Sequence, residues 1–368
     1  MNKRIRKLGT ARSGQRGLGI KENQRARELY EEIFSEDSKA FVDYYFKVKA
    51  SENEIYVVEN ADTDEILATL HLNPYPVILC GHKVNTAYIV AVATRADCRH
   101  QGMMASLLEI SIQDLYQKES PFTWLMPAAE AIYRPFGFRF IYQKNQMVLY
   151  TKESSSHGER TSELICRPAK TDDLAELAVF ADKMLPGIAK VYAIHDRDYF
   201  AQRMQELASE SGHLVLFISG GSICGYFLAS PKESEAWEIV VEKAHEAEAK
   251  AALLAWFREK ECVQVKITAF PESWEEQGDC SHISAIMGRI VYLERFVQYL
   301  KTDQKRRWCV KLRDDLIAEN NGIFQITLGT DGGSLERMRD GGSNIRQMDI
   351  GELLEEIFKV PVYLNELV

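Results

Sequence analysis

Residues 87–105 carry the residue types and spacing that could hold a phosphate group. The segment Tyr88–Ala93 is rich in apolar and β-branched residues, which predicts a strand buried on both faces. It is followed by Arg99-His100-Gln101-Gly102, after which apolar residues recur at helical spacing. A strand that enters a helix through a glycine-containing turn leaves free backbone N–H groups at the positive end of the helix dipole. The pattern predicts an anion cradle suited to a pyrophosphate, although an ordinary strand-to-helix turn would show the same short motif.

This segment resembles motif A of the GCN5-related N-acetyltransferases (GNAT). The family's signature is Arg or Gln, two residues, Gly, one residue, then Gly or Ala. Arg99 and Gly102 fill the first two places, and Met104 departs from the small residue expected at the third. Downstream, a short predicted strand at Phe122–Met126 and the series Tyr133-Arg134-Pro135-Phe136-Gly137-Phe138 match the family's Tyr-x-x-x-Gly-Phe turn. Two matches in the right order imply an acetyltransferase fold.

Composition limits the class of protein. The 368 residues suggest two or three domains. With 45 basic and 54 acidic residues the net charge is −9, which argues against nucleic acid as the main partner and is compatible with a cationic one. Neither a secretory signal nor an apolar run long enough to span a membrane is apparent, so we expect a cytoplasmic protein.

The seven cysteines are scattered and never form a C-x-x-C pair, so neither a disulfide framework nor a metal site is predicted. The expectation is a set of buried free thiols in a reducing compartment. They are Cys80, Cys98, Cys166, Cys224, Cys262, Cys280 and Cys309.

The first part of the chain is predicted to run helix, meander, strand, helix. Lys21–Phe34 reads as an amphipathic helix. Strands are expected at Ile55–Val58, Ile66–Leu72 and Val77–Cys80 before the strand of the anion cradle. The polar, serine-rich stretch 151–161 has the composition of a linker and is the best domain boundary.

After this linker a helix is expected near Leu174, with Thr171 as its N-cap. Strands at Leu214–Ile218 and Ile223–Ala229 are separated by Gly220-Gly221, a hairpin signal. This opening resembles a second acetyltransferase domain. Nothing between residues 236 and 273 repeats the Arg-x-x-Gly element, so we interpret the region as a degenerate repeat without a second cofactor site.

The last part of the chain is predicted to be a third α+β domain. Helices are expected at Leu293–Leu300 and Ile350–Phe358. Strands at Trp308–Leu312 and Ile323–Leu328 flank Asn320-Asn321-Gly322, which predicts a hairpin turn.

The whole layout resembles the Eis (enhanced intracellular survival) family. That resemblance implies an α+β fold of tandem GNAT domains, the second degenerate, followed by a sterol-carrier-like domain. The expected boundaries are 1–152, 163–282 and 283–368. It also implies a homo-oligomer, most often a hexamer.

The resemblance assigns roles to particular residues. Tyr133 matches the general acid that protonates the departing thiolate, and the C-terminal carboxylate of Val368 is the expected general base. The alternatives are that Tyr133 only packs against its turn and that the terminus is a frayed tail. The residues expected to bind the co-substrate acetyl-CoA are Val90, Ala91, Val92, Arg99, His100, Gln101, Gly102, Met103, Met104, Ala105, Ala128 and Ala129.

The predicted activity is transfer of an acetyl group to a primary amine of a small cationic molecule, aminoglycoside-like or polyamine-like, or of a lysine. Acidic residues on the first helices and near the C-terminus could attract ammonium groups, although such residues are more often a solvated helix face. They are Glu31, Glu32, Glu36, Asp37 and Glu366. The competing hypothesis is a non-enzymatic lipid-binding or scaffold protein in which the anion cradle is vestigial.

Overall fold

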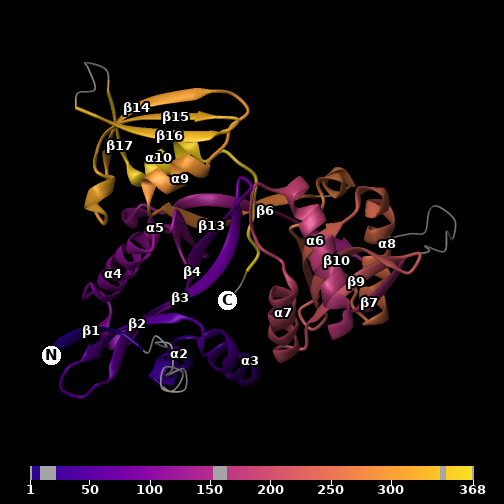
Figure 1. The fold of residues 1–368 in the computed structure, drawn as a ribbon. Coiled ribbons are helices and arrows are strands. Elements are labelled where there is room, and N and C mark those ends of the chain that lie inside the picture. Colours follow the sequence, from indigo (N-terminus) through magenta and orange to yellow (C-terminus); the bar gives the residue numbers. More distant parts are fainter. Residues whose placement is uncertain (1, 9–21, 152–163, 278, 340–344, 367–368) are drawn as a thin grey trace. The chain divides into compact units, whose positions relative to one another are not determined.

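The structure is a computed structural model that describes residues 2–8, 22–151, 164–277, 279–339 and 345–366. The chain divides into two compact units. Unit 1 comprises residues 1–142, 190–193 and 285–368, and unit 2 comprises residues 143–189 and 194–284. Figure 1 labels many of the elements of each unit. The predicted linker, apart from Thr151, lies outside the described residues.

The larger sheet of unit 1 is mixed. Its strands follow the order β1, β2, β3, β4, β5, β13, and of these neighbours only β4 and β5 run parallel. A parallel pair, β8 and β18, extends the sheet beside the far end of β3. The strands are β1 (Lys3–Lys7), β2 (Glu54–Asn60), β3 (Ile66–Leu79), β4 (His82–Thr94), β5 (Phe122–Leu125), β8 (Val191–Ala193), β13 (Ser281–Ile290, of which Met287–Ile290 pair with β5) and β18 (Val362–Tyr363).

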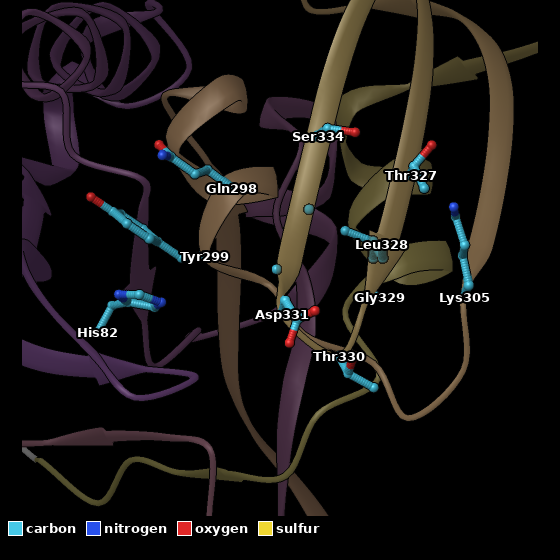
Figure 2. A pocket seen from close by; sticks show the side chains of 12 residues that line it. His82, Gln298, Tyr299, Lys305, Thr327, Leu328, Gly329, Thr330, Asp331 and Ser334 are labelled. Carbon is cyan, nitrogen blue, oxygen red and sulfur yellow. The ribbon is translucent and has the colours of Figure 1, made fainter.

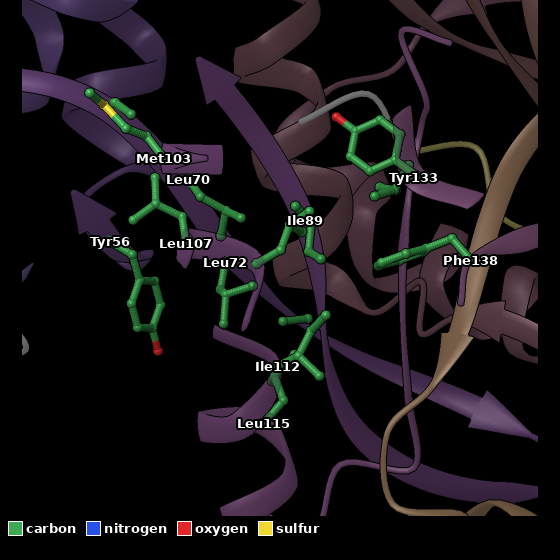
Figure 3. Packing of buried hydrophobic residues seen from close by; sticks show 14 of the residues in the cluster. Tyr56, Leu70, Leu72, Ile89, Met103, Leu107, Ile112, Leu115, Tyr133 and Phe138 are labelled. Carbon is green, nitrogen blue, oxygen red and sulfur yellow. The ribbon is translucent and has the colours of Figure 1, made fainter. Parts of the chain in front are cut away.

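Helices cover both faces of this sheet. They are α2 (Arg27–Ile33), α3 (Lys39–Tyr44), α4 (Met103–Gln117) and α5 (Glu130–Tyr133). Leu107 and Ile112 of α4 pack on Leu70 and Ile89 in one buried cluster, which Figure 3 shows. A second cluster joins aromatic residues of α2, α3 and the following turn to β2 and β4. Burial of each such side chain stabilises the fold by about 1.5–3 kcal/mol.

Strand β3 corrects one expectation. Two strands were predicted, at Ile66–Leu72 and Val77–Cys80, because Pro74 and Pro76 interrupt the apolar run. The structure has one strand, which pairs with β4 from Ala68 to Leu79 with one register shift between Thr69 and His71. On its other side β3 meets β2 before the prolines and β8 after them. The prolines lie in the interval between these two partners, where a missing N–H removes no ladder bond.

A four-stranded sheet in the order β16, β15, β14, β17 forms the rest of unit 1. Its elements are β14 (Arg306–Arg313), β15 (Gly322–Gly329), β16 (Gly332–Met338), β17 (Arg346–Asp349), α9 (Leu293–Tyr299) and α10 (Ile350–Ile357). The predicted helices and strands are present, and β14 and β15 form the predicted antiparallel hairpin, but a loop longer than the Asn320-Asn321-Gly322 turn joins them. Eight residues join β14 to β15, and Asn321 instead bonds the carbonyl groups of Asp314 and Ile317 from within that loop.

Unit 2 contains a mixed sheet in the order β6, β12, β11, β10, β9, β7, in which only β11 and β12 run parallel. Its elements are β6 (Arg139–Tyr150, of which 146–150 pair with β12), β7 (Ile165–Pro168), α6 (Leu174–Ile188), α7 (Arg197–Ser209), β9 (His213–Ser219), β10 (Ser222–Ser230), β11 (Glu235–Val241), α8 (Glu246–Glu259) and β12 (Gln264–Thr268). The Gly220-Gly221 hairpin turn is confirmed.

Thr171 is not the N-cap that the sequence predicted. It is the first residue of a 3₁₀ turn, Thr171–Asp173, that precedes α6. Lys170 occupies the capping position, and the Asp173 carboxylate accepts its backbone N–H at 2.7 Å. Asp173 also binds Arg167, so an acidic side chain three residues further on does the work expected of the threonine.

The two units share an order of elements. Unit 1 runs β1, α2, α3, β2, β3, β4, α4, β5, and unit 2 runs β7, α6, α7, β9, β10, β11, α8, β12. In each unit the final two strands are the parallel pair. The strand that follows β5 in the chain, β6, then pairs with β12, whereas the strand that follows β12, β13, pairs with β5. The two units therefore exchange a strand: β6, which follows β5 in the sequence, belongs to the sheet of unit 2, and β13, which follows β12, belongs to the sheet of unit 1.

The cysteines are all free. Cys80, Cys98 and Cys224 are buried as expected, but Cys309 is exposed and the other three are half-buried. The expectation of uniformly buried thiols is therefore wrong.

Candidate active site

A β-bulge distorts the strand that leads to the predicted cradle. Ala91 has φ +52°, and the register of β4 with β3 shifts between the pairs Thr69–Ala93 and His71–Val90. The parallel pairing with β5 involves only Tyr88 and Ile89. In the described chain no strand pairs with β4 on that side beyond Ile89. The backbone of Val90, Ala91 and Val92 is therefore available to a ligand between the diverging strands.

Gly102 makes the turn into α4. It is the N-cap of the helix with φ +77°, a left-handed conformation that favours glycine, and no side chain caps the helix. A Cβ at this position would meet no atom within 4 Å. Residues 99–102 are exposed. The first-turn N–H groups of Met103, Met104 and Ala105 therefore lie at the positive end of a four-turn helix beside open space, as an anion site requires.

The departure at Met104 does not block this turn. Its side chain is half-buried and packs against the cluster beneath α4. His100 has φ +60°, so the residues just before the helix adopt two left-handed conformations. Arg99 contacts the Thr94 carbonyl at 3.5 Å, and Gln101 accepts a hydrogen bond from Lys3 at 2.9 Å.

Tyr133 ends the short helix α5. Its side chain is 6% exposed and meets Phe138 edge to face, with ring centroids 6.0 Å apart. Figure 3 shows the hydroxyl pointing away from Phe138 and Ile112. Burial raises the pKa of the Tyr133 phenol above its ordinary value. The group therefore keeps its proton throughout the neutral range and can serve as a proton donor, which a phenolate could not.

Two arginines that the sequence analysis missed hold the turn after Tyr133. Arg289 of β13 donates to the Phe136 carbonyl at 2.7 Å and to Asp314 at 2.5 Å, and both side chains are fully buried. Arg139 donates to the carbonyl groups of Arg134 and Phe138. The sequence did offer a signal for Arg289, because it is the one charged residue within the apolar run 287–291.

Gly137 explains why this turn ends in glycine. It has φ +81°, and a Cβ there would lie 2.6 Å from Cγ2 of Ile350 on α10. Any other residue would be strained and would push α10 away. The four-stranded part of unit 1 is thus packed directly against the turn that carries Tyr133.

Ala128 and Ala129 follow β5 and are exposed. Ala129 is the N-cap of α5 in extended conformation. They lie between the end of β5 at Leu125 and the start of α5, beyond the point where β5 diverges from β4. Their backbone is accordingly open to solvent, as the expected contact with a co-substrate requires.

Val368 lies outside the described residues. The segment before it is buried: Leu364, Asn365 and Glu366 are at most 1% exposed. The Tyr142 hydroxyl lies 3.4 Å from Oδ1 of Asn365. The described part of the C-terminal segment is thus buried, and it is held in unit 1 by this contact and by the pairing of β18 with β8.

The predicted acidic residues differ in their surroundings. Glu31 pairs with Arg27 at 2.8 Å, as on a solvated helix face, and Asp37 accepts from Tyr30 at 2.7 Å. Glu36 is exposed. Glu32 lines a pocket of about 220 Å³ together with Arg25, Glu28, Leu29, Asp64, Glu65, Ile66 and Arg95. Glu366 alone is fully buried.

A buried polar layer beneath β4 was also missed. The Tyr45 hydroxyl lies 2.7 Å from Nδ1 of His71 and accepts a hydrogen bond from the Asn53 side chain at 3.2 Å. His71 is the partner of Val90 in the β3–β4 ladder. Lys49 donates to the Tyr75 hydroxyl at 3.0 Å. Burial lowers the pKa of His71 to about 3, so this imidazole is neutral and acts as a structural hydrogen-bonding group. The signal was the polar residues that alternate within the apolar strand 66–79.

A separate open pocket of about 700 Å³ lies among α9, the β15–β16 turn and His82, which stacks on Tyr299 (Figure 2). None of the predicted site residues lines it. It is therefore distinct from the region of Tyr133 and Gly102.

Comparisons with known proteins agree with this geometry. Residues 15–141, about a third of the chain, match the model of the acetyltransferase (GNAT) domain. No curated protein sequence matches the chain. No helix among the described residues is long and apolar enough to cross a membrane.

Three solved structures share the fold. A probable N-acyltransferase of unknown function from Enterococcus faecalis V583 superposes with a TM-score of 0.77 at 15% identity, over 95% of this chain and 88% of that one. A GCN5-related N-acetyltransferase from Anabaena variabilis ATCC 29413 gives 0.75 at 14%, over 97% and 90%. Eis1 from Mycobacterium abscessus gives 0.68 at 12%, over 97% and 89%.

At these identities the structures show the fold alone: a mixed α+β GNAT fold with a large mixed sheet and a second small sheet. The domain match goes further, because it identifies the part of unit 1 that contains the bulged strand and the Gly102 turn. The presence of this domain in residues 15–141 implies an acyl-CoA-dependent N-acetyltransferase.

Proposed function

We propose that the protein transfers an acetyl group from acetyl-CoA to a primary amine of a small cationic molecule, or of a lysine, by direct attack of the amine on the thioester. The observation that carries this proposal is the divergence of β4 from β5 next to the glycine-initiated helix α4. Together they offer a strand edge for an acyl chain and a helix terminus for a pyrophosphate.

In this proposal the donor lies along β4. The N–H groups of residues 102–105 bind the pyrophosphate, with Arg99, His100 and Gln101 lining the exposed rim. The backbone of Val90, Ala91 and Val92 holds the acyl end, and an N–H group of this edge stabilises the oxyanion that develops on the thioester carbonyl. Ala128 and Ala129, which follow β5, line the opposite side of the proposed donor site.

The proton transfers complete the scheme. A primary amine has a pKa of about 10.4 and arrives protonated, so a base must remove its proton. We assign this role to the α-carboxylate of Val368, directly or through a water molecule. As the C–N bond forms and the C–S bond breaks, the Tyr133 hydroxyl gives its proton to the departing thiolate. The pairing of β18 with β8 and the burial of Leu364, Asn365 and Glu366 support this assignment.

The proposed class of acceptor follows from the negative charge of the protein. The net charge of −9 and the acidic residues Glu32, Glu36 and Glu366 favour a polyamine-like or aminoglycoside-like cation. The buried polar layer at Tyr45, His71 and Lys49 lies under the same strand as the proposed acyl site.

We also propose that unit 2 is a degenerate second copy of the GNAT fold, within tandem domains 1–152 and 163–282, and that residues 283–368 form a sterol-carrier-like domain. The shared element order of the two units supports the repeat. The Eis resemblance supports a hexamer, and light scattering on the purified protein tests it, since a monomer would refute this assembly.

The activity is tested by measuring free thiol released from acetyl-CoA with a panel of polyamines, aminoglycosides and lysine peptides. Turnover with at least one cationic amine and none with matched neutral alcohols is expected. The absence of turnover with every amine would reject the proposed acceptor class. A second measurement tests the base: a tag added after Val368 should depress kcat, whereas the same tag at the N-terminus should not.

A further inference from the structure

Three metal-binding side chains meet in unit 2, remote in sequence from the residues assigned to acetyl transfer. Glu275, Cys280 and His282 each offer one ligand atom, and all these atoms lie within 4.8 Å of one another. Oε1 of Glu275 is 3.5 Å from Nε2 of His282. This is a carboxylate, a thiol and an imidazole around one point.

The local chain explains why two of them face the same way. Cys280 immediately precedes β13 and His282 is the second residue of that strand. Alternate residues of an extended chain project from the same face, so a Cys-x-His sequence presents both donor atoms together. The spacing is invisible to a search for C-x-x-C pairs, which is why the sequence analysis predicted no metal site.

The third group is held in place by a residue from another part of unit 2. Asn145 donates to Oε1 of Glu275 at 2.9 Å and to the carbonyl of Phe270 at 2.9 Å, and its own oxygen accepts the Phe270 N–H at 3.0 Å. These bonds to backbone fix the amide, which in turn orients the carboxylate. Such outer hydrogen bonds accompany the ligands of metal sites and tune their affinity.

The donor set selects the ion. Tetrahedral zinc has bonds of about 2.0–2.3 Å, which places neighbouring ligand atoms about 3.3–3.8 Å apart. The Glu275–His282 separation of 3.5 Å falls in this range. A thiol disfavours calcium and magnesium, whereas thiolate, imidazole and carboxylate together suit zinc.

We propose that Glu275, Cys280 and His282 form a zinc site with three protein ligands and a water molecule in the fourth position. Binding deprotonates the Cys280 thiol and releases that proton to solvent while the Zn–S bond forms. The ion ties the 3₁₀ segment Glu272–Gln277 to the start of β13. It is a structural clamp within unit 2 and takes no part in acetyl transfer.

The test uses the full chain, freed of metal by a chelator and kept reduced. Titration with Co²⁺, followed by absorption, should give one equivalent of bound cobalt with a thiolate-to-cobalt charge-transfer band that Zn²⁺ abolishes by competition. Cys280→Ser should remove the band, and Cys280→Ser or His282→Asn should weaken zinc binding by more than about 100-fold. Asn145→Ala should keep the band and weaken binding about tenfold.

Two variants are matched controls. Cys309→Ser removes an exposed thiol, and His245→Asn removes a histidine that lies 3.5 Å from Glu248. Neither residue belongs to the ligand group of the described residues, so both variants should bind cobalt and zinc as the unaltered protein does. Absence of the band, its survival in Cys280→Ser, or equal losses in the controls would overturn the proposal. Should Cys280→Ser fail to fold, Asn145→Ala and His282→Asn still decide the outcome.

Discussion

Strand β4 of unit 1 and strand β11 of unit 2 are built alike. Each has a bulge at a residue with positive φ, +52° at Ala91 and +53° at Glu238. Each pairs in parallel with the next strand only before its bulge. Each is followed by a 3₁₀ turn and then by a long helix, α4 or α8.

The residues at these equivalent places differ. Ala91 is small, whereas the buried Glu238 carboxylate accepts from Tyr226 at 3.3 Å and lies 3.5 Å from His195. Helix α4 begins at the left-handed Gly102, whereas α8 begins at His245 with φ −110°. The bulge thus belongs to the scaffold, while the small bulge residue and the glycine are the features that the proposed donor site uses. Unit 2 has the bulge, but it has neither a small residue at the bulge nor a glycine at the start of the helix.

The largest expected effect tests whether chemistry is confined to unit 1. Tyr133→Phe should lower kcat by about 10²–10⁴-fold, because it removes the proposed proton donor for the thiolate, and should leave acetyl-CoA binding nearly unchanged. Steady-state kinetics and calorimetric binding measure the two quantities. The exposed Tyr150 of unit 2 provides the control, since Tyr150→Phe should change neither. An unaltered kcat in Tyr133→Phe would refute the role.

The next prediction compares the two buried arginines. Arg289 binds Asp314 in unit 1 and Arg203 binds Glu206 at 2.6 Å in unit 2, each at most 2% exposed. Replacing either arginine by Met leaves a buried carboxylate without its charged partner and should lower the free energy of unfolding by about 3–5 kcal/mol. Only Arg289→Met frees the Phe136 carbonyl beside Tyr133, so only it should reduce kcat at temperatures where both variants are folded. Equal kcat values for the two variants would show that Arg289 merely stabilises the fold.

The sequence predicted the parts of this comparison that depend on local pattern. The Gly102 turn, the order of strands and helices, and the Gly220-Gly221 hairpin follow from periodicity and glycine placement. It did not predict the bulge at Ala91, because a positive φ at alanine leaves no compositional trace. The exchange of β6 and β13 was also missed, since strand pairing depends on contacts between residues more than a hundred positions apart. The same holds for Arg289 and Phe136, which are 153 residues apart.

A smaller effect sharpens the role of the glycine. In Gly102→Ala, the left-handed conformation costs about 1–2 kcal/mol. If the turn moves to relieve this strain, the first-turn N–H groups move with it, and the KM for acetyl-CoA should rise about tenfold. Gly221 of unit 2 has φ +87° and equally open surroundings. Gly221→Ala should therefore cost similar stability in thermal unfolding without changing KM. Equal KM values for the two variants would remove the helix terminus from donor binding.

The smallest expected effect concerns pH. Burial raises the pKa of Tyr133, and among the described residues its hydroxyl has no hydrogen-bond partner, whereas Tyr226 of unit 2 donates to Glu238. The donor therefore stays protonated to at least the ordinary phenol value of about 10. Since amine acceptors lose their protons near 10.4, kcat/KM should rise with pH and show no falling limb below about pH 10. A fall that begins earlier and disappears in Tyr133→Phe would mean that the phenol loses its proton too readily to protonate the thiolate.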